Sequence, residues 1–214
     1  MTTLARLSAA DVSLGGRPIL RGLDLELKKA DVIGVVGPNG SGKTTLMRTL
    51  ATLIPLAGGS GHVLDADLNS NDIFGVRRSI GMIGHAPALI PQLTLHENLI
   101  HVANLERIAH DEVDRTISIV GLEEAGDRLA TESSFGMKRR IEVAHLLLRN
   151  PRLLLLDEAT AGLDHEAREL IGALVARCIG GDGAVVLVSH DQGQFPQSTS
   201  TILRLLEGVL VPAQ

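Results

Sequence analysis

The stretch 34-GVVGPNGSGKTT-45 decides the fold of this 214-residue chain. It contains the pattern G-x-x-x-x-G-K-[ST], with Gly37, Gly42, Lys43 and Thr44 at the fixed positions. Glycines let successive backbone N–H groups turn toward phosphate oxygens, the lysine reaches the β and γ phosphates, and the threonine hydroxyl can ligate Mg²⁺. An apolar run precedes the loop and a helical pattern follows it. This order predicts a strand, a phosphate-binding loop and a helix.

The whole loop is expected to take part in ATP binding, because its backbone curls around the phosphates. The expected ATP-binding residues of the loop are Gly37, Pro38, Asn39, Gly40, Ser41, Gly42, Lys43, Thr44 and Thr45. Kinases, GTPases and ATPases all use such a loop, so the loop alone does not choose the reaction.

Outward from the loop, short apolar runs alternate with helical patterns. The runs 153-LLLL-156 and 184-AVVLVS-189 are continuous and bounded by polar residues, which is typical of buried parallel strands. Helical patterns are predicted over 43–54, 111–121, 138–150 and 166–180. This alternation predicts an α/β fold.

The beginning of the chain has a different pattern. Residues 4–14 and 19–28 alternate with period two and are joined by the turn 15-GGRP-18. These segments predict a pair of antiparallel strands beside the main sheet. Between about residues 90 and 148 no segment predicts a strand, so a mostly helical lobe is expected there.

Composition narrows the class of protein. A net charge of −5 provides no basic field, so nucleic acid is not an expected partner. The single cysteine, Cys178, cannot form an internal disulfide and suits a reducing compartment. No apolar run reaches the length of a membrane-spanning helix. We expect a soluble cytoplasmic protein.

Two adjacent carboxylates follow the apolar run 153–156. Asp157 is expected to help hold Mg²⁺, and Glu158 to polarise a water molecule for attack on the γ-phosphate. Ligands of open α/β sheets bind at the carboxyl ends of the strands, where both residues are predicted to lie. A solvated acidic turn is the alternative, but four leucines before it favour the catalytic reading.

His190 stands at the end of the apolar run 184–189. A histidine at this place can hydrogen-bond the γ-phosphate and the attacking water without acting as the base. A purely structural role is the alternative for a single histidine. The phosphate loop and the paired carboxylates favour the catalytic role.

The second half of the chain resembles the ATP-binding subunits of ABC transporters. The stretch that carries the resemblance is 133-SSFGMKRRIEVAHLLLRNPRLLLLDEATAGLD-164. It is similar to the family's signature motif, the helix after it, the Walker B strand and the D-loop. The signature residues are matched by Ser134, Phe135, Gly136 and Met137, with Phe135 in place of the family's first glycine. Asp164 matches the D-loop aspartate and His190 the switch histidine.

The resemblance implies a P-loop NTPase (RecA-like) core with an N-terminal antiparallel β subdomain and an inserted helical subdomain. Residues 1–89 and 149–214 would form the core, and 90–148 the helical subdomain with the signature. It also implies that a second copy, in a homodimer, presents its signature to the nucleotide.

The basic residues 138-KRR-140 lie in the predicted first turn of a helix, where the helix dipole disfavours positive charge. An anion nearby is therefore expected, and a solvated basic face is the alternative.

Two further roles follow only from the resemblance. Leu14 takes the place of the aromatic residue that stacks on adenine, so weak discrimination between ATP and GTP is expected. His85, in 84-GHAPALIPQLTLHENL-99, takes the place of a glutamine near Mg²⁺ and water. Magnesium prefers oxygen ligands, so His85 is expected to contact the nucleotide through water. The alternative is a histidine without a nucleotide role.

The leading hypothesis is an ATPase subunit, using ATP and Mg²⁺, on the inner face of the cell membrane. It would power a separate multi-spanning membrane subunit. Within this reading the chain resembles the haem-exporter ATPases of cytochrome c biogenesis first and drug-exporter ATPases second. The alternative is an ABC ATPase outside a transporter, such as an iron–sulfur assembly ATPase. A small-molecule kinase comes third, because 133-SSFGM-137 argues against it.

Overall fold

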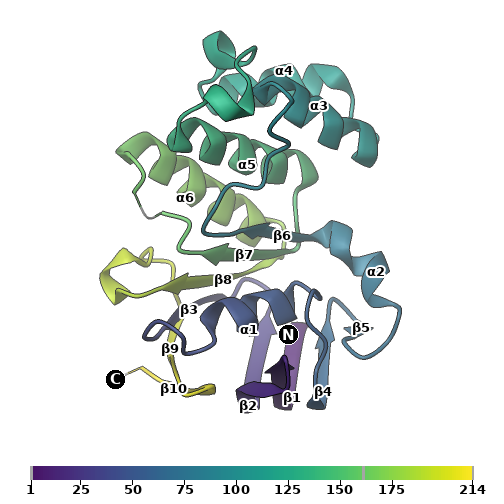
Figure 1. The fold of residues 1–214 in the computed structure, drawn as a ribbon, viewed down its shortest axis with the longest axis vertical. Coiled ribbons are helices and arrows are strands. Elements are labelled where there is room, and N and C mark those ends of the chain that lie inside the picture. The colour runs from purple at the N-terminus through teal and green to yellow at the C-terminus, as the bar shows by residue number, and fades with distance from the viewer. Residues whose placement is uncertain (1, 161, 214) are drawn as a thin grey trace. The chain divides into compact units, whose positions relative to one another are not determined.

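The computed structural model describes residues 2–160 and 162–213. Its N-terminal part forms an antiparallel sheet in the order β2-β1-β4-β5 (Figure 1). The strands are β1 Thr3–Leu14, β2 Arg17–Lys28, β4 Gly58–Val63 and β5 Ala66–Asp67. Gly15 and Gly16, with φ of 55° and 78°, make the tight turn between β1 and β2. The predicted antiparallel pair is therefore confirmed.

The second sheet is the α/β sheet, in the order β10-β9-β3-β8-β7-β6. Its strands are β3 Val32–Val36, β6 Ile80–Ile83, β7 Leu153–Asp157, β8 Ala184–Ser189, β9 Thr201–Leu206 and β10 Val209–Pro212. β3 pairs in parallel with β8 and β9, and β7 in parallel with β8, while β9 and β10 are antiparallel. The parallel strands bring their carboxyl ends to one edge of the sheet.

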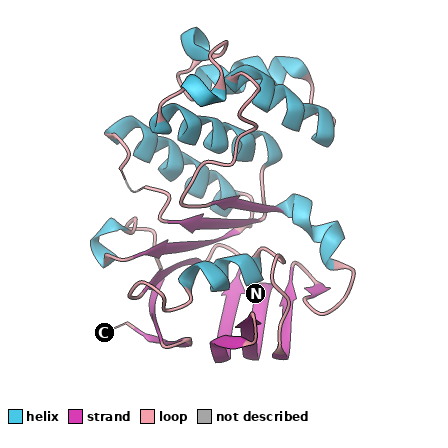
Figure 2. Cartoon of the chain, viewed as in Figure 1, coloured by secondary structure: helices cyan, strands magenta, loops and turns pink. Residues whose placement is uncertain are grey.

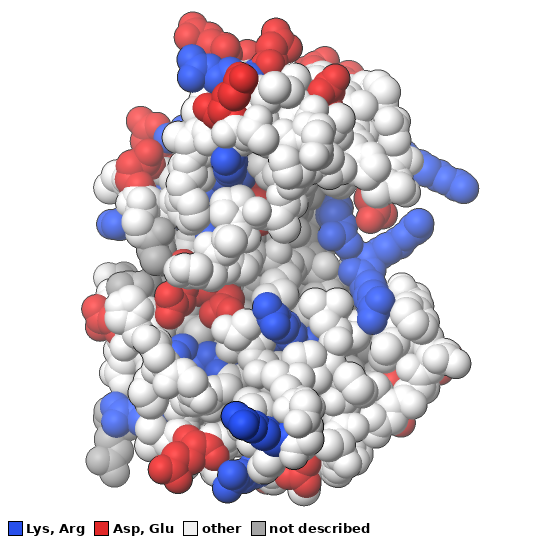
Figure 3. Space-filling view, in the orientation of Figure 1, with Lys and Arg blue, Asp and Glu red and all other residues white. Residues whose placement is uncertain are grey.

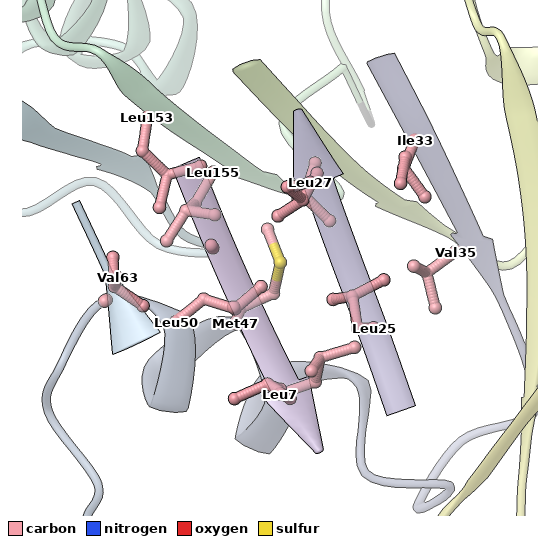
Figure 4. Packing of buried hydrophobic residues seen from close by; sticks show 14 of the residues in the cluster. Leu7, Leu25, Leu27, Ile33, Val35, Met47, Leu50, Val63, Leu153 and Leu155 are labelled. Atoms are coloured by element: carbon pink, nitrogen blue, oxygen red, sulfur yellow. The ribbon is translucent and has the colours of Figure 1, made fainter. Parts of the chain in front are cut away.

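An apolar core joins the two sheets and the helix α1, Lys43–Leu50. Met47 and Leu50 of α1 lie among leucines and valines of both sheets, as Figure 4 shows. Every residue of β3, β7 and β8 is buried. Burying one Leu or Val side chain stabilises a fold by about 1.5–3 kcal/mol, so this core holds the strand ends in place.

Helices form the remaining elements, drawn in cyan in Figure 2. The longer ones are α3 Leu95–Glu106, α4 His110–Ile119, α5 Phe135–Arg149 and α6 His165–Gly180. The shorter ones are α2 Ile73–Val76, η1 Arg77–Ser79, η2 Glu123–Ala125, η3 Ala130–Glu132 and η4 Gln192–Gln194. α3, α4 and α5 pack against one another. No helix in the described residues is long and apolar enough to cross a membrane.

The chain divides into two compact units, and each is described separately below. The first unit contains residues 1–82, 151–158 and 178–214, and the second contains 83–150 and 159–177. The interval 90–148, described throughout, holds α3, α4 and all of α5 except its last residue, and no strand. The subdomain boundaries proposed from the sequence stay a prediction.

Several boundaries differ from those predicted. α5 begins at Phe135 rather than at Lys138, because the Ser134 hydroxyl caps it by accepting the Met137 N–H at 3.2 Å. α1 ends at Leu50 rather than at residue 54. β4 has the sequence GGSGHV, which carries neither an apolar alternation nor β-branched residues before its last position, so nothing in the sequence predicted it.

Candidate functional site

The phosphate loop joins the buried strand β3 to α1. Gly42 caps the helix with a left-handed backbone, φ 106°, and Gly40 has φ 79°. A Cβ atom at Gly37 would lie 2.4 Å from the Leu205 carbonyl oxygen, so only glycine fits there. The predicted roles of these glycines as conformational requirements therefore have a structural basis.

Lys43 is the first residue of α1 and is 7% exposed. Its Nζ donates to the carbonyl oxygens of Gly37 at 2.8 Å and Pro38 at 3.0 Å, which places the ammonium across the loop. The Ser41 hydroxyl is buried without a hydrogen-bond partner among the described residues. A cation and an unsatisfied hydroxyl inside a glycine-rich loop suit a phosphate group, which needs donors.

The phosphate loop and β7 meet through one hydrogen bond. The Thr44 hydroxyl donates to Asp157 Oδ2 at 2.8 Å, although 113 residues separate them in sequence. Asp157 is the last residue of β7 and is buried. Thr44 and Asp157 thus form a pair of hard oxygen donors, which fits Mg²⁺.

Glu158 lies directly after β7, with a left-handed backbone of φ 52°. Its N–H donates to the Val188 carbonyl oxygen of β8 at 3.0 Å. Glu158 Oε1 lies 3.7 Å from His190 Nδ1, so these two predicted catalytic side chains are neighbours. His190 follows the end of β8, as the sequence predicted.

Some of the predicted site residues line a hollow of about 920 Å³ in the first unit. Its lining residues are Val36, Gly37, Pro38, Asn39, Glu158, His190, Asp191, Gln192, Arg204 and Leu206. The parallel register explains the gathering, because β3, β7 and β8 end at the same edge. The structure therefore brings the start of the phosphate loop together with Glu158 and His190.

Five lining residues were missed by the sequence reasoning: Val36, Asp191, Gln192, Arg204 and Leu206. Arg204 is opposite Val36 in the parallel pairing of β9 with β3, which puts it beside the loop. The short apolar-rich run 201-TILRLL-206, followed by 207-EG-208, is the signal that could have predicted β9. No motif marks these positions.

The signature residues and Asp164 lie together in the second unit. Ser134, Gly136, Met137, Arg140 and Asp164 line a hollow of about 760 Å³. Phe135 is 44% exposed at the start of α5. The Asp164 carboxylate accepts the Ala167 N–H at 2.8 Å, and this bond together with Arg140 lowers the pKa of Asp164.

The basic residues after the signature do not crowd the first turn, and this prediction was wrong. α5 starts at Phe135, so Arg139 and Arg140 lie in its second turn. Arg140 pairs with Glu166 at 2.8 Å, and Arg139 pairs with Glu142 at 2.7 Å. Carboxylates of the same chain therefore supply the anions that the sequence called for at these two positions.

Three further predicted residues, His85, Leu14 and Thr45, are not among the lining residues of the first hollow. His85 is exposed and lies in the second unit, beyond the end of β6 at Ile83. Leu14 is the last residue of β1, is 41% exposed and does not line the hollow. Thr45 is buried in α1, where its carbonyl accepts the Thr49 hydroxyl. The roles predicted for these residues stay predictions.

On the face shown in Figure 3, positive and negative side chains are mixed. In the view of Figure 3, Lys and Arg side chains occur over the face among Asp and Glu, without one continuous basic stripe.

Among the described residues no cluster of three or more His, Cys, Asp or Glu has the arrangement of a metal site. A metal at Thr44 and Asp157 would therefore need ligands from elsewhere, such as the phosphates of a nucleotide.

The sequence of this chain is similar to those of known proteins. The family model described as ABC transporter matches residues 20–161. The cytochrome c biogenesis ATP-binding export protein CcmA of Bordetella bronchiseptica is 37% identical over 190 residues, covering 87% of this chain and 84% of the relative. The daunorubicin resistance ATP-binding protein DrrA3 of Streptomyces coeruleorubidus is 34% identical over 192 residues, covering 88% and 60%.

Among solved structures, the ATP binding subunit of an ABC transporter superposes with a TM-score of 0.88 at 20% identity, covering 98% of this chain and 90% of that one. At this identity the likeness concerns the fold alone. The chain spans 52%, 60% and 58% of the length of three curated relatives that it matches.

Proposed function

This chain belongs to the ABC transporter family as an ATP-binding domain, and we propose that it hydrolyses ATP to power a transporter. The observation that carries the proposal is the Thr44–Asp157 hydrogen bond of 2.8 Å. It joins the phosphate loop to the strand end that presents Glu158. A phosphate-binding loop and a candidate base are thereby held in one unit of the fold.

The predicted site residues have the following proposed roles. The loop amides and Lys43 bind the β and γ phosphates, with Lys43 exchanging its present carbonyl acceptors for phosphate oxygens. Glu158 accepts a proton from the attacking water, and His190, 3.7 Å from it, orients the water and the γ-phosphate. His85 is proposed to contact the nucleotide through water.

Thr44 and Asp157 are the residues that would hold Mg²⁺. A bound Mg²⁺ would supply positive charge that stabilises the negative charge of the transferred phosphoryl group. Thr44 and Asp157 keep their oxygen atoms at one place in the fold, so the protein side of this site is ordered in advance.

A second copy is proposed to complete the site. Ser134, Gly136 and Met137 line a hollow of the second unit together with Asp164, and we assign this hollow to the nucleotide held by the other copy. The Ser134 N-cap orders the start of α5. Backbone amides of the first turn of α5 are therefore proposed to bind an anion. The working unit is then a homodimer with two nucleotides.

The membrane part is proposed to be a separate multi-spanning subunit, with this chain bound to its inner face. The segment 86–93, apolar and in part exposed, is a candidate contact. The helical subdomain 90–148 is proposed to move against the core formed by 1–89 and 149–214 as ATP is bound and hydrolysed.

For the transported substrate, we favour export in cytochrome c biogenesis, with haem as the cargo. The support is the length of the match, since this chain spans 84% of CcmA but only 60% of DrrA3. A drug-exporter ATPase is the second candidate, supported by the 34% identity to DrrA3. The family membership does not favour an iron–sulfur assembly ATPase.

The test is ATP turnover with Mg²⁺ by the purified chain and two variants. Glu158→Gln should bind ATP, accumulate as a dimer and lose turnover by about 100-fold or more, because the candidate base is gone. Lys43→Ala should lose ATP binding itself. Glu207→Gln is the matched control, since Glu207 also has a left-handed backbone, φ 48°, but does not line the hollow. Unchanged turnover by Glu158→Gln would remove Glu158 from its role.

A further inference from the structure

Arg139 and Glu142 form a buried ion pair within α5. Their side chains are 1% and 8% exposed, and Arg139 Nη1 lies 2.7 Å from Glu142 Oε2. Burial raises the pKa of Glu142 and lowers the pKa of Arg139, so each charge is held at a cost. A buried pair often stabilises a fold no better than two apolar side chains of the same volume. Stability alone therefore does not account for it.

Both side chains are bonded to the segment that carries His85. Arg139 donates through Nη1 to the Gly84 carbonyl oxygen at 2.8 Å and through Nη2 to the His85 carbonyl oxygen at 3.1 Å. Glu142 Oε1 accepts the Ala88 N–H at 2.9 Å. Residues 84–88 belong to neither a helix nor a strand, so these bonds replace the pairing that a ladder would provide.

Arg139 also contacts the signature residue Phe135. The guanidinium carbon lies 5.2 Å from the centre of the Phe135 ring, a distance at which cation and ring attract. Phe135 is the first residue of α5 and follows the cap Ser134. One guanidinium therefore contacts the start of the signature helix on one side and the backbone of His85 on the other.

We propose that Arg139 and Glu142 are positioning residues. They hold the start of α5, which carries the signature residues, and residues 84–88 in a fixed position relative to each other. A nucleotide that engages the signature then acts on His85 through Arg139, without a contact of its own to Arg139. The inference rests on the proposed function, because it assigns this positioning to ATP turnover. It also makes a purely structural claim, that side chains of α5 hold residues 84–88.

The first experiment measures ATP turnover by the full chain in a double-mutant cycle. Arg139→Gln and His85→Ala should each lower kcat by about 10-fold with KM little changed, and the double variant should be no slower than either single one. Arg139→Lys should not restore kcat, because an ammonium lacks the fork that bonds two carbonyl groups. Effects that multiply in the double variant would overturn the proposal, because Arg139 would then not act through His85.

A matched control exists on the surface. Arg115 pairs with Glu112 at the same i,i+3 spacing and 2.6 Å, but the two side chains are 63% and 49% exposed. Arg115→Gln should leave kcat unchanged. A loss of kcat in this control as large as that in Arg139→Gln would mean that removing any helical arginine suffices, and would overturn the proposal.

The second experiment needs no turnover. In amide hydrogen exchange, Ala88 should exchange about 10-fold faster in Arg139→Gln and in Glu142→Ala, while Glu142→Gln, which keeps an acceptor, should change it less. Unchanged exchange at Ala88 in the first two variants would overturn the proposal. If the unmodified chain hydrolyses no ATP, the proposed function fails, yet the exchange result still decides whether Arg139 and Glu142 hold residues 84–88. Glu142→Ala also serves if Arg139→Gln does not fold.

Discussion

The two units treat buried polar groups in opposite ways. In the first, the core is a cluster of Leu, Val, Ile, Ala and Met, and its functional polar groups lie at strand ends or in the loop after β3. In the second, charged or amide side chains are buried inside the helical packing, with Arg139, Glu142 and Asn98 each under 9% exposed. The first unit positions its site mainly by strand register, to which the Thr44–Asp157 hydrogen bond adds, whereas the second relies on hydrogen bonds of buried side chains.

Asn98 illustrates the second method. Its Oδ1 accepts the Ile90 N–H at 2.8 Å, and its Nδ2 donates to the carbonyl oxygens of Ile90 at 3.2 Å and Thr94 at 2.8 Å. A single amide therefore fixes the turn before α3. The difference teaches that loops of the second unit depend on individual side chains, whereas the first hollow depends on backbone packing.

The largest effect on ATP affinity is expected from a change in the backbone packing of the first unit. Gly37→Ala should lower ATP affinity by about 100-fold or more, because the new Cβ would lie 2.4 Å from the Leu205 carbonyl oxygen and 2.9 Å from Ser41 Oγ, forcing the loop to move. Equilibrium binding of ATP measures it. Gly75→Ala is the control, since nothing lies within 4 Å of its Cβ. An equal loss in both variants would break the comparison.

A smaller effect should come from a buried group of the second unit. Burial, first of all, lowers the pKa of His145 to about 4, with Arg149 and His101 adding to the effect and the Asn98 carbonyl, 3.3 Å from Nε2, opposing it. The unfolded chain protonates His145 first, so stability is present above about pH 6.5 and is lost as the pH falls toward about 4.

This pH effect can be separated from that of other groups. Between about pH 7 and about pH 5, the free energy of unfolding should fall by about 2 kcal/mol through His145. Denaturant unfolding of the unmodified chain and of His145→Gln at several pH values measures this effect. It is the difference between the slopes of the free energy of unfolding against pH for the two proteins. His110→Gln, at an exposed histidine bonded to Asn104, is the comparison variant. Equal slopes for the chain and His145→Gln would contradict the assignment.

The smallest effect should appear at Leu14. Leu14→Tyr should strengthen nucleotide binding by about 1 kcal/mol, because a ring can stack on a base whereas leucine only packs against it. Competition between ATP and GTP should show weak discrimination in the unmodified chain. Strong adenine preference with Leu14 in place would refute the assignment of this residue to the base.

Much of the first unit could be predicted from the sequence, and the reason is local. The phosphate loop, Asp157, Glu158 and His190 each follow an apolar run, and strand ends of a parallel sheet meet at one edge. The sequence predicted that Thr44 and Asp157 would both help to hold Mg²⁺, but not the hydrogen bond between them. β9 and Arg204 were missed, because no motif marks 201–206.

The second unit was harder to predict for a physical reason. The contacts of Arg139 with Gly84 and His85 join residues 54 or more positions apart, and no periodicity of either segment announces them. The sequence led us to expect an anion near 138–140, but not that Glu142 and Glu166 would supply the charge. Capping by Ser134, which moved the start of α5, was readable from the sequence and was overlooked.

The backbone conformation of Glu158 has a consequence for which substitutions selection for stability would favour. Its left-handed backbone, φ 52°, costs an ordinary L-residue about 1 kcal/mol that glycine would not incur. A variant library screened only for thermal stability would therefore enrich glycine at position 158 and discard the carboxylate. Consensus or stability-guided engineering of this chain should hold that position fixed, since here durability and turnover favour different residues.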